Sequence, residues 1–259
     1  MVNLDKKQRN NLSISKMIYT TKGIVLRTIK YGETSVIASI FTELFGIQSY
    51  IVNGVRTQSK TSKAHFFQPS SILEMEVYHN ELKNLQRIKD LRWSYLYKNI
   101  LSDVIKNAVA LYMTELLQKC LKQPEANTDL FNFCEDAFMQ LDISGNDITA
   151  NFPIYFALQL AHFFGLRIQD DYSSERKFFE ISEGKFTKET TAHGYFLAEG
   201  ISYQLSQLLK AMQPADLQEI KMNKNIRKEI LAALEQYYGF HFAEFGLMKT
   251  LPVLHELLS

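Results

Sequence analysis

The sequence predicts an α+β protein in which a small N-terminal β-barrel is followed by a mainly α-helical domain with a loop-rich insert. Short β-branched runs separated by turn residues fill the first 90 residues. Apolar residues then recur every three or four positions, the spacing of amphipathic helices. Between residues 166 and 200 this spacing gives way to charged residues, Ser, Thr and Gly. The 259 residues are 46% hydrophobic with only 11 Gly and 5 Pro, which disfavours strands and turns throughout.

Five strands are expected in the first domain, to which we assign residues 17–90. Gly32, Gly46 and Asn53-Gly54 mark the turns after the first three strands. Leu73, Met75 and Val77 alternate with other residues and should share one face of the fourth. Five short strands suit a closed or nearly closed barrel, because closure removes exposed edges, and an SH3-like barrel fits this pattern equally well. The expected strands cover residues 22–30, 34–42, 47–52, 71–78 and 82–88.

Residues 91–259 are expected to form the helical domain, with the insert at 166–200. Thr128 and Asp129 suit the start of its second helix, and Pro153 stands where a first-turn proline is tolerated. The expected helices cover residues 93–122, 128–141, 154–164, 201–212, 226–238 and 247–258. Residues 1–16 are polar and lack periodicity, and they end just before Met17. We expect them to be a flexible extension, added by an upstream start of translation.

Positive charge is concentrated at the N-terminal end of the chain. The net charge is +1 overall, but residues 1–63 hold ten Lys/Arg and three acids, a net +7, and the remainder carries −6. This division favours a basic N-terminal module that meets a polyanion, although lysines that merely solubilise a small domain are the alternative.

The strongest basic cluster is the loop at residues 53–63, NGVRTQSKTSK, which contains no acid. Lys and Arg in such a loop can contact phosphates while its hydroxyl and amide groups donate hydrogen bonds. Nearby aromatic residues could stack on bases, but each is more simply a core residue; they are Tyr19, Tyr31, Phe41 and Tyr50. The candidate DNA-binding residues, expected on one face of the barrel, are Lys22, Arg27, Lys30, Arg56, Lys60 and Lys63.

No catalytic or metal-binding motif is found. Phosphate-binding, dinucleotide-binding and hydrolase motifs are absent, and the six histidines lie far apart. Cys120 and Cys134 lack CxxC spacing and are expected to be reduced and buried in a cytoplasmic protein. No window supplies the ~20 apolar residues of a membrane span, and the N-terminus has no apolar core of a secretory signal. We therefore expect no cofactor, no metal and no membrane partner.

Two other functions stay open from the residues alone. A protein-interaction scaffold would use the barrel to bind a partner protein, with positive charge only steering association. A nuclease or nucleotidyl transferase would need clustered acids for Mg²⁺ near the basic face, but residues 17–63 contain only Glu33 and Glu43. The enzyme is the weakest of these hypotheses.

A series of motifs nevertheless occurs in a fixed order between residues 22 and 69. They are Lys22-Gly23-Ile24-Val25-Leu26, Tyr31-Gly32-Glu33, Phe41-Thr42, Gly46, Gly54-Val55-Arg56 with Ser59-Lys60, and Phe67-Gln68-Pro69. In this order they resemble the start of the bacterial RecO family of recombination mediators. The resemblance is specific over about 60 residues, and the helical region, including Phe245–Leu257, is compatible with it.

The resemblance implies an OB-fold barrel, a mainly helical domain and a zinc-ribbon-like insert. It also implies a non-catalytic protein that binds single- and double-stranded DNA and anneals complementary strands. With RecR, such a protein helps load RecA onto DNA coated with single-stranded-DNA-binding protein (SSB). SSB is recruited through its acidic, apolar C-terminal tail, which docks on the helical domain. Lys98, Lys106 and Lys119, expected on the first long helix, are candidate contacts, and a merely solvated helix face is the alternative. A cytoplasmic, nucleoid-associated location goes with this role.

The insert departs from the family in one respect. Many members carry four cysteines there with the spacing of zinc ligands, whereas residues 166–200 contain none. We therefore expect no bound zinc. A small apolar cluster should hold the insert instead, made of Phe178, Phe179, Ile181, Phe186 and Tyr195.

Overall fold

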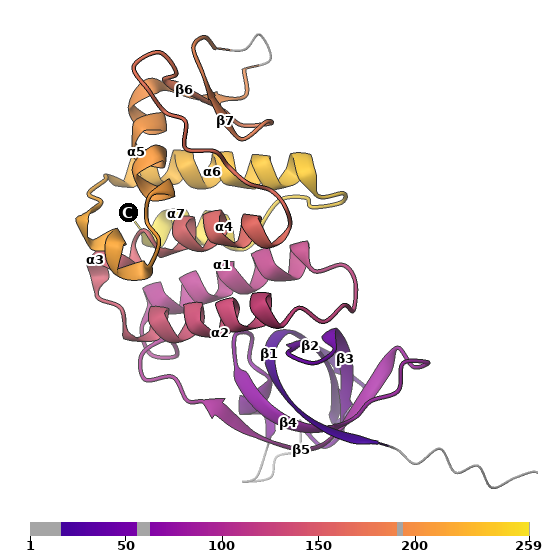
Figure 1. Ribbon diagram of the computed structural model, residues 1–259. Coiled ribbons are helices and arrows are strands. Elements are labelled where there is room, and N and C mark those ends of the chain that lie inside the picture. Colours follow the sequence, from indigo (N-terminus) through magenta and orange to yellow (C-terminus); the bar gives the residue numbers. More distant parts are fainter. Residues whose placement is uncertain (1–16, 56–62, 191–193, 259) are drawn as a thin grey trace, which may run out of the picture.

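The computed structural model describes residues 17–55, 63–190 and 194–258 (Figure 1). A β-barrel lies at one end of the molecule, layers of helices are stacked upon it, and the insert lies at the opposite end. The sequence order of barrel, helices, insert and helices is thus also an arrangement along the long direction of the molecule.

Five strands close into the barrel in the order β1-β2-β3-β5-β4. Its elements are β1 (Ile18–Tyr31), β2 (Ser35–Thr42), β3 (Gly46–Val52), the 3₁₀ helix η1 (Lys63–Phe67), β4 (Ile72–Tyr78) and β5 (Leu85–Tyr95). Neighbours pair antiparallel except β3 and β5, which pair in parallel over three residues. This order, with a short helix between β3 and β4, is that of an OB fold and decides against the SH3-like alternative.

The last strand differs most from the prediction. Leu82, expected inside it, lies in the preceding turn and is 93% exposed. At its other end, Trp93 pairs with Leu73 and Tyr95 pairs with Ile72. The helix expected from residue 93 therefore begins only at Val104. The apolar residues between Trp93 and Ile100 have helical spacing, but they belong to a strand and to the linker that follows it.

Alternate residues of the strands fill the barrel. Leu73, Met75 and Val77 are buried, as expected, and Tyr50 and Ile40 join them in the same core. One end of the barrel is closed by η1, whose Phe67 is 3% exposed and packs into this core. Burial of these side chains supplies most of the driving force for folding of the barrel.

Helices supply most of the second core. None of the helices in the described part of the chain is long and apolar enough to cross a membrane. They are α1 (Val104–Cys120), α2 (Thr128–Ile143), α3 (Asn146–Thr149), α4 (Phe152–Phe163), α5 (Glu199–Leu209), η2 (Pro214–Glu219), α6 (Lys224–His241) and α7 (Thr250–Leu257). The short elements α3 and η2 were not predicted. Pro153 lies in the first turn of α4, as expected. The N-cap of α2 is Asn127 and not Thr128, because the Asn127 Oδ1 accepts the N–H of Leu130 at 2.9 Å.

A buried carboxylate of α2 joins the barrel to the helices. Asp142 is fully buried, and its carboxylate accepts the backbone N–H groups of Lys98, Asn99 and Ile100 at 2.8–2.9 Å. The hydroxyl of Tyr95, at the end of β5, donates to the same carboxylate at 3.2 Å. Burial raises the pKa of Asp142, but the three N–H groups outweigh this and hold it below its ordinary value. The linker after the barrel is thus fixed to α2.

A close backbone contact supports the same junction. Gly46 begins β3 with a φ of +63°, and a Cβ there would lie 2.3 Å from the carbonyl oxygen of Glu125. Only glycine allows the loop between α1 and α2 to approach the barrel this closely.

The insert forms a three-stranded sheet in the order β7-β6-β8. Its strands are β6 (Phe178–Glu180), β7 (Lys185–Thr187) and β8 (Phe196–Leu197). Phe179, Ile181 and Phe186 are buried, as predicted. Tyr195 is not part of this cluster, because it is 44% exposed and packs edge-on against Phe240 of α6.

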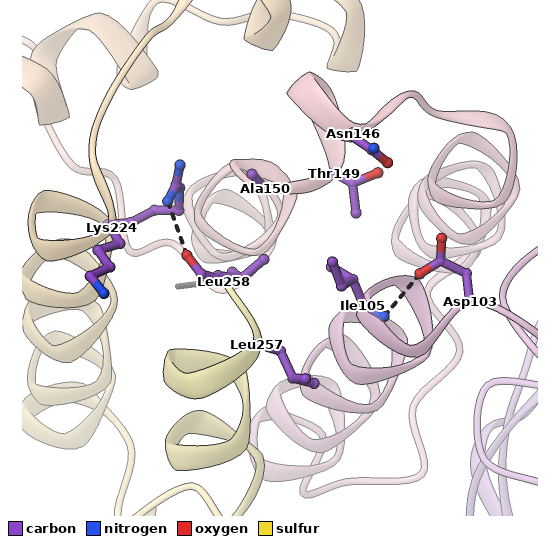
Figure 2. Close-up of a pocket in the computed structure, with 9 residues that line it drawn as sticks. Asp103, Ile105, Asn146, Thr149, Ala150, Lys224, Leu257 and Leu258 are labelled. Atoms are coloured by element: carbon purple, nitrogen blue, oxygen red, sulfur yellow. Dashed lines mark hydrogen bonds between the residues drawn. The ribbon is translucent and has the colours of Figure 1, made fainter.

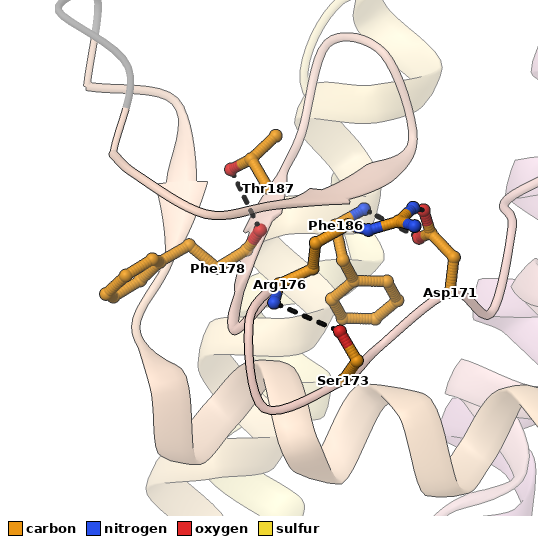
Figure 3. Close-up of polar contacts among 6 residues, drawn as sticks. All are labelled: Asp171, Ser173, Arg176, Phe178, Phe186 and Thr187. Carbon is orange, nitrogen blue, oxygen red and sulfur yellow. Dashed lines mark hydrogen bonds and ion pairs between the residues drawn. The ribbon is translucent and has the colours of Figure 1, made fainter.

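Polar contacts close the turn before β6 (Figure 3). Asp171 forms an ion pair with Arg176, and its other oxygen accepts the N–H of Phe186 at 3.0 Å. Ser173 and Arg176 exchange two backbone hydrogen bonds of 3.1 Å. No group of three or more His, Cys, Asp or Glu that could hold a metal ion occurs among the residues that the structure describes. The residues of the insert, which include no cysteine, do not fit the four-cysteine zinc site that many members of the family carry there.

Candidate nucleic-acid interface

We use the term plugged end for the surface formed by η1, Thr28, Lys30 and Trp93. The hydroxyl of Thr28 donates to the carbonyl oxygen of Phe67 at 2.8 Å and thereby holds η1 against β1. Lys30 lies two residues further along β1, on the same face of the strand as Thr28, and is exposed. Lys63, the first residue of η1, is also exposed. Two of the predicted cations thus belong to one end of the barrel.

Arg27 lies on the other face of β1. The register with β2 shifts between Val25 and Arg27, after which Arg27 is opposite Ser39 and Thr28 is opposite the buried Ala38. Arg27 is therefore on the outer face of the sheet, and Lys30 is not. The two-residue period of the strand separates the two side chains, and the expectation that all the basic residues lie on one face of the barrel stays a prediction.

Lys22 is engaged in the junction with the helical domain. Its Nζ lies 2.8 Å from Oε2 of Glu135 on α2, and the Glu135 side chain is only 11% exposed. The hydrogen bond to Glu135 raises the pKa of Lys22 above its ordinary value, against the opposing effect of burial. Its position in sequence beside other cations did not reveal this partner, which lies 113 residues away.

Arg56 and Lys60 fall outside the described residues, so their assignment stays a prediction. They belong to a sequence stretch, residues 53–71, that contains no Asp or Glu and ends in η1 and the turn after it.

Charge is distributed unevenly around the barrel. On β4 and β5, Glu74 pairs with Arg92 at 2.5 Å and Glu76 pairs with Lys89 at 2.7 Å. No such ion pair is seen for Arg27, Lys30 or Lys63 with any described residue. Cations without an acidic partner attract phosphate more strongly than cations already neutralised by acids, so Arg27, Lys30 and Lys63 are better placed to meet an anion than Lys89 and Arg92.

Most of the aromatic residues named from the sequence are core residues. Phe41 and Tyr50 are fully buried, and Tyr19 packs edge-on against Phe45 with the ring centroids 5.2 Å apart. Only Tyr31 is half exposed.

Sequence reasoning missed an aromatic group at the plugged end. His65 and Phe66 of η1 lie against Trp93 of β5, with the Phe66 and Trp93 centroids 4.9 Å apart. The motif KAHFF after a basic loop is the only signal that could have indicated it, and the location of Trp93 in a strand was not foreseen.

A pocket of about 440 Å³ opens in the helical domain (Figure 2). Ile105, Leu257 and Leu258 supply apolar walls. Lys224 and Arg227 of α6 supply positive charge, and the one acid in the lining, Asp103, caps the start of α1. The Arg227 guanidinium is tied to protein oxygens, donating to Asn151 at 3.2 Å and Met222 at 3.1 Å, whereas Lys224 is exposed. Ile105 belongs to α1 and Leu257 to α7. Each of these helices has a further exposed apolar residue, Val104 in α1 and Val253 in α7.

Two of the three lysines suggested for an acidic tail are already engaged. Lys106 is 6% exposed and donates to the carbonyl oxygen of Asp142 at 2.7 Å. Lys119 donates to the carbonyl oxygen of Phe245 and lies over its ring. Only Lys98 is exposed. Helical periodicity alone could not distinguish these lysines, because the partner of Lys106 lies in α2 and that of Lys119 in the loop between α6 and α7.

Comparison with known proteins agrees with this architecture. The family model described as the N-terminal part of recombination protein O matches residues 17–97, and the model of its C-terminal part matches residues 101–250. A DNA repair protein RecO of Bacteroides fragilis is 31% identical over 245 residues, covering 94% of this chain and all of the relative. RecO proteins of Phocaeicola vulgatus and Azobacteroides pseudotrichonymphae are 30% and 28% identical, again over 94% of this chain and their full length. With both parts matched and the barrel and helices in the expected order, this chain belongs to the RecO family.

Proposed function

We propose that this protein is a non-catalytic accessory factor of DNA repair and recombination. It binds single- and double-stranded DNA, anneals complementary strands and, with RecR, helps load RecA onto DNA coated with SSB. Membership of the RecO family supports the repair role. The observation that carries the binding activity is the group of exposed cations, Arg27, Lys30 and Lys63, that form no ion pair with any residue the structure describes.

The DNA contacts that we propose are Arg27, Lys30 and Lys63, together with Arg56 and Lys60 of the neighbouring basic loop. Lys22 is left out because Glu135 neutralises it. Such contacts bind the phosphate backbone and release counterions, so affinity falls steeply with salt and depends little on sequence.

Annealing needs no bond-making chemistry from the protein. Two strands whose charge is neutralised repel each other less and can pair if their bases stay accessible. Backbone contacts from lysine and arginine at an exposed barrel end meet this requirement, because they leave the hydrogen-bonding edges of the bases free.

The helical-domain pocket is our candidate site for the acidic, apolar C-terminal tail of SSB. Its walls include Ile105 and Leu257, which suit apolar side chains. The exposed Lys224 stands in the first turn of α6, where the helix dipole adds to its attraction for carboxylates. We therefore propose Lys224 as the contact for the tail in place of Lys106 and Lys119, whose ammonium groups already bind backbone carbonyls.

Annealing of two complementary dye-labelled strands, followed by energy transfer without added nucleotide, tests the main proposal. We expect wild-type protein to accelerate pairing and the double variant Lys30→Ala, Lys63→Ala to lose most of this effect. The control, Lys89→Ala with Lys188→Ala, removes two lysines already paired with Glu76 and Glu175. Equal annealing by both double variants, or no acceleration by wild type, contradicts the proposal.

Binding of a labelled SSB tail peptide tests the pocket separately. Lys224→Glu should weaken peptide binding, because it places a like charge beside the peptide carboxylates. Lys122→Glu, an equal charge change at an exposed lysine of the loop after α1, should not. Equal losses in the two variants would show that only net charge matters and that the pocket is not the site.

A further inference from the structure

We propose that His65, Phe66 and Trp93 form a stacking platform for unpaired bases of a single nucleic-acid strand bound at the plugged end. The inference rests on the proposed DNA binding and names the part of the DNA that this end holds. It separates two kinds of contact: lysines for the phosphates, and aromatic rings for the faces of the bases.

The three rings form one continuous group. The His65 and Phe66 centroids are 4.3 Å apart, those of Phe66 and Trp93 are 4.9 Å apart, and those of His65 and Trp93 are 6.0 Å apart. The ring planes are inclined to one another by only 34–36°. The rings therefore form a compact triangular cluster, and its exposed ring, His65, can receive a further flat ring.

The barrel core anchors this group of rings. Phe66 and Trp93 are partly buried and pack against the core cluster, whereas His65 is exposed. The inner rings are thus already ordered, so a base that stacks on the group meets little entropy cost from fixing side chains. Packing of the barrel explains why Phe66 and Trp93 are apolar, but it does not require an exposed imidazole in contact with both of them.

The surroundings of this group of rings suit a nucleic-acid strand. Lys63 precedes His65 by two residues in η1, and Lys30 lies on the face of β1 that η1 covers. Residues 53–71, which include the whole of η1, contain no acid. Cations that follow the backbone, beside rings that receive the bases, are the combination found in sequence-tolerant single-strand binding sites. Inside a duplex the base faces are stacked on each other, so only its two terminal pairs expose one.

Trp93 offers a direct test, because it is the only tryptophan in the chain. Its emission is measured while an oligothymidylate of about 12 nucleotides is added to the full-length protein, with anisotropy of a labelled oligonucleotide as the independent measure of binding. We expect emission to be quenched in step with binding. A blunt duplex of matching length should bind without comparable quenching.

Two variants and a control sharpen the test. His65→Ala should weaken single-strand binding by about fivefold or more, the loss typical of one stacked base, and duplex binding less. Phe66→Leu keeps an apolar side chain against the core and should act in the same direction, with the fold checked by circular dichroism. His241→Ala is the matched control, because His241 is an exposed histidine packed on a ring, Tyr237, at 4.6 Å on α6.

The outcomes are distinguishable. The platform is overturned if Trp93 emission is unchanged at saturating oligonucleotide and His65→Ala binds with wild-type affinity. The rings would then serve barrel packing or a protein partner. The binding measured in the same titration would still uphold the proposed function. Equal quenching by the blunt duplex also overturns base stacking. Absence of any binding by wild-type protein overturns the proposed function and the platform together.

Discussion

Replacing Asp142 by Ala should loosen the attachment of the barrel to the helical domain. The substitution removes the acceptor of three backbone N–H groups, those of Lys98, Asn99 and Ile100, and of the Tyr95 hydroxyl. Hydrogen bonds to a charged acceptor contribute about 1.5–3 kcal/mol each, and an N–H left buried without a partner costs about 1–3 kcal/mol.

These contributions are not additive, because water can reach some of the freed groups once the carboxylate is gone. We therefore expect Asp142→Ala to lower the free energy of unfolding by about 3–5 kcal/mol, in the range typical of breaking a buried charged network. For a protein of this size that corresponds to a fall of about 6–20 °C in Tm.

Urea unfolding followed by two probes measures this effect. Trp93 fluorescence reports on the barrel, since Trp93 lies in β5, and far-ultraviolet circular dichroism reports mainly on the helices. The two transitions should coincide in the wild type and separate in Asp142→Ala, because the carboxylate couples the two parts. Asp136→Ala, an exposed aspartate on the same helix, is the control and should change little. Coincident transitions at wild-type stability in Asp142→Ala would refute the reasoning.

Further predictions concern charge, pH and metal. Lys22→Ala should leave single-strand affinity within about twofold of wild type, whereas Lys63→Ala should reduce the slope of log K against log salt by about 1. Anisotropy at several salt concentrations compares the two variants. A larger loss of affinity in Lys22→Ala than in Lys63→Ala contradicts the assignment. Because the pKa of Asp142 in the folded protein lies below its ordinary value of 3.8, the stability it contributes is present above pH 3.8 and is lost as pH falls through the lowered pKa. The acid limb of a stability–pH profile should therefore be shallower in Asp142→Asn, and identical limbs would disprove this role. A chelator should not shift the melting temperature, because no metal is expected in the insert. Arg176→Ala, which breaks the ion pair with Asp171, should lower the melting temperature by a few degrees. A fall in melting temperature when chelator is added to the wild type would reveal a metal-dependent insert.

The strands with clear alternation could be predicted from the sequence. Leu73, Met75 and Val77 face the barrel core because a strand's period of two puts every second residue on one side. The end of β5 could not be predicted, since Trp93 and the apolar residues after it fit helical spacing equally well. Pairing with β4, a contact distant in sequence, decides in favour of the strand.

The charged residues of the candidate site were harder to judge. Composition correctly located the basic end of the chain, but it could not tell that Lys22 meets Glu135 of α2 or that Lys106 meets Asp142. Such partners are set by tertiary packing, and a single sequence carries no direct signal of them. The spacing of Arg27 and Lys30, three residues in a regular strand, does place their side chains on opposite faces of β1.

The most direct test of the central claim is anisotropy of a labelled single-stranded oligonucleotide titrated with the full-length protein at two salt concentrations, without metal or nucleotide. The account predicts tight binding at low salt, a steep loss of affinity as salt rises, and an oligonucleotide that stays intact. Absence of binding at low salt would contradict it and favour a barrel that binds a partner protein, and cleavage of the strand would contradict the non-catalytic assignment.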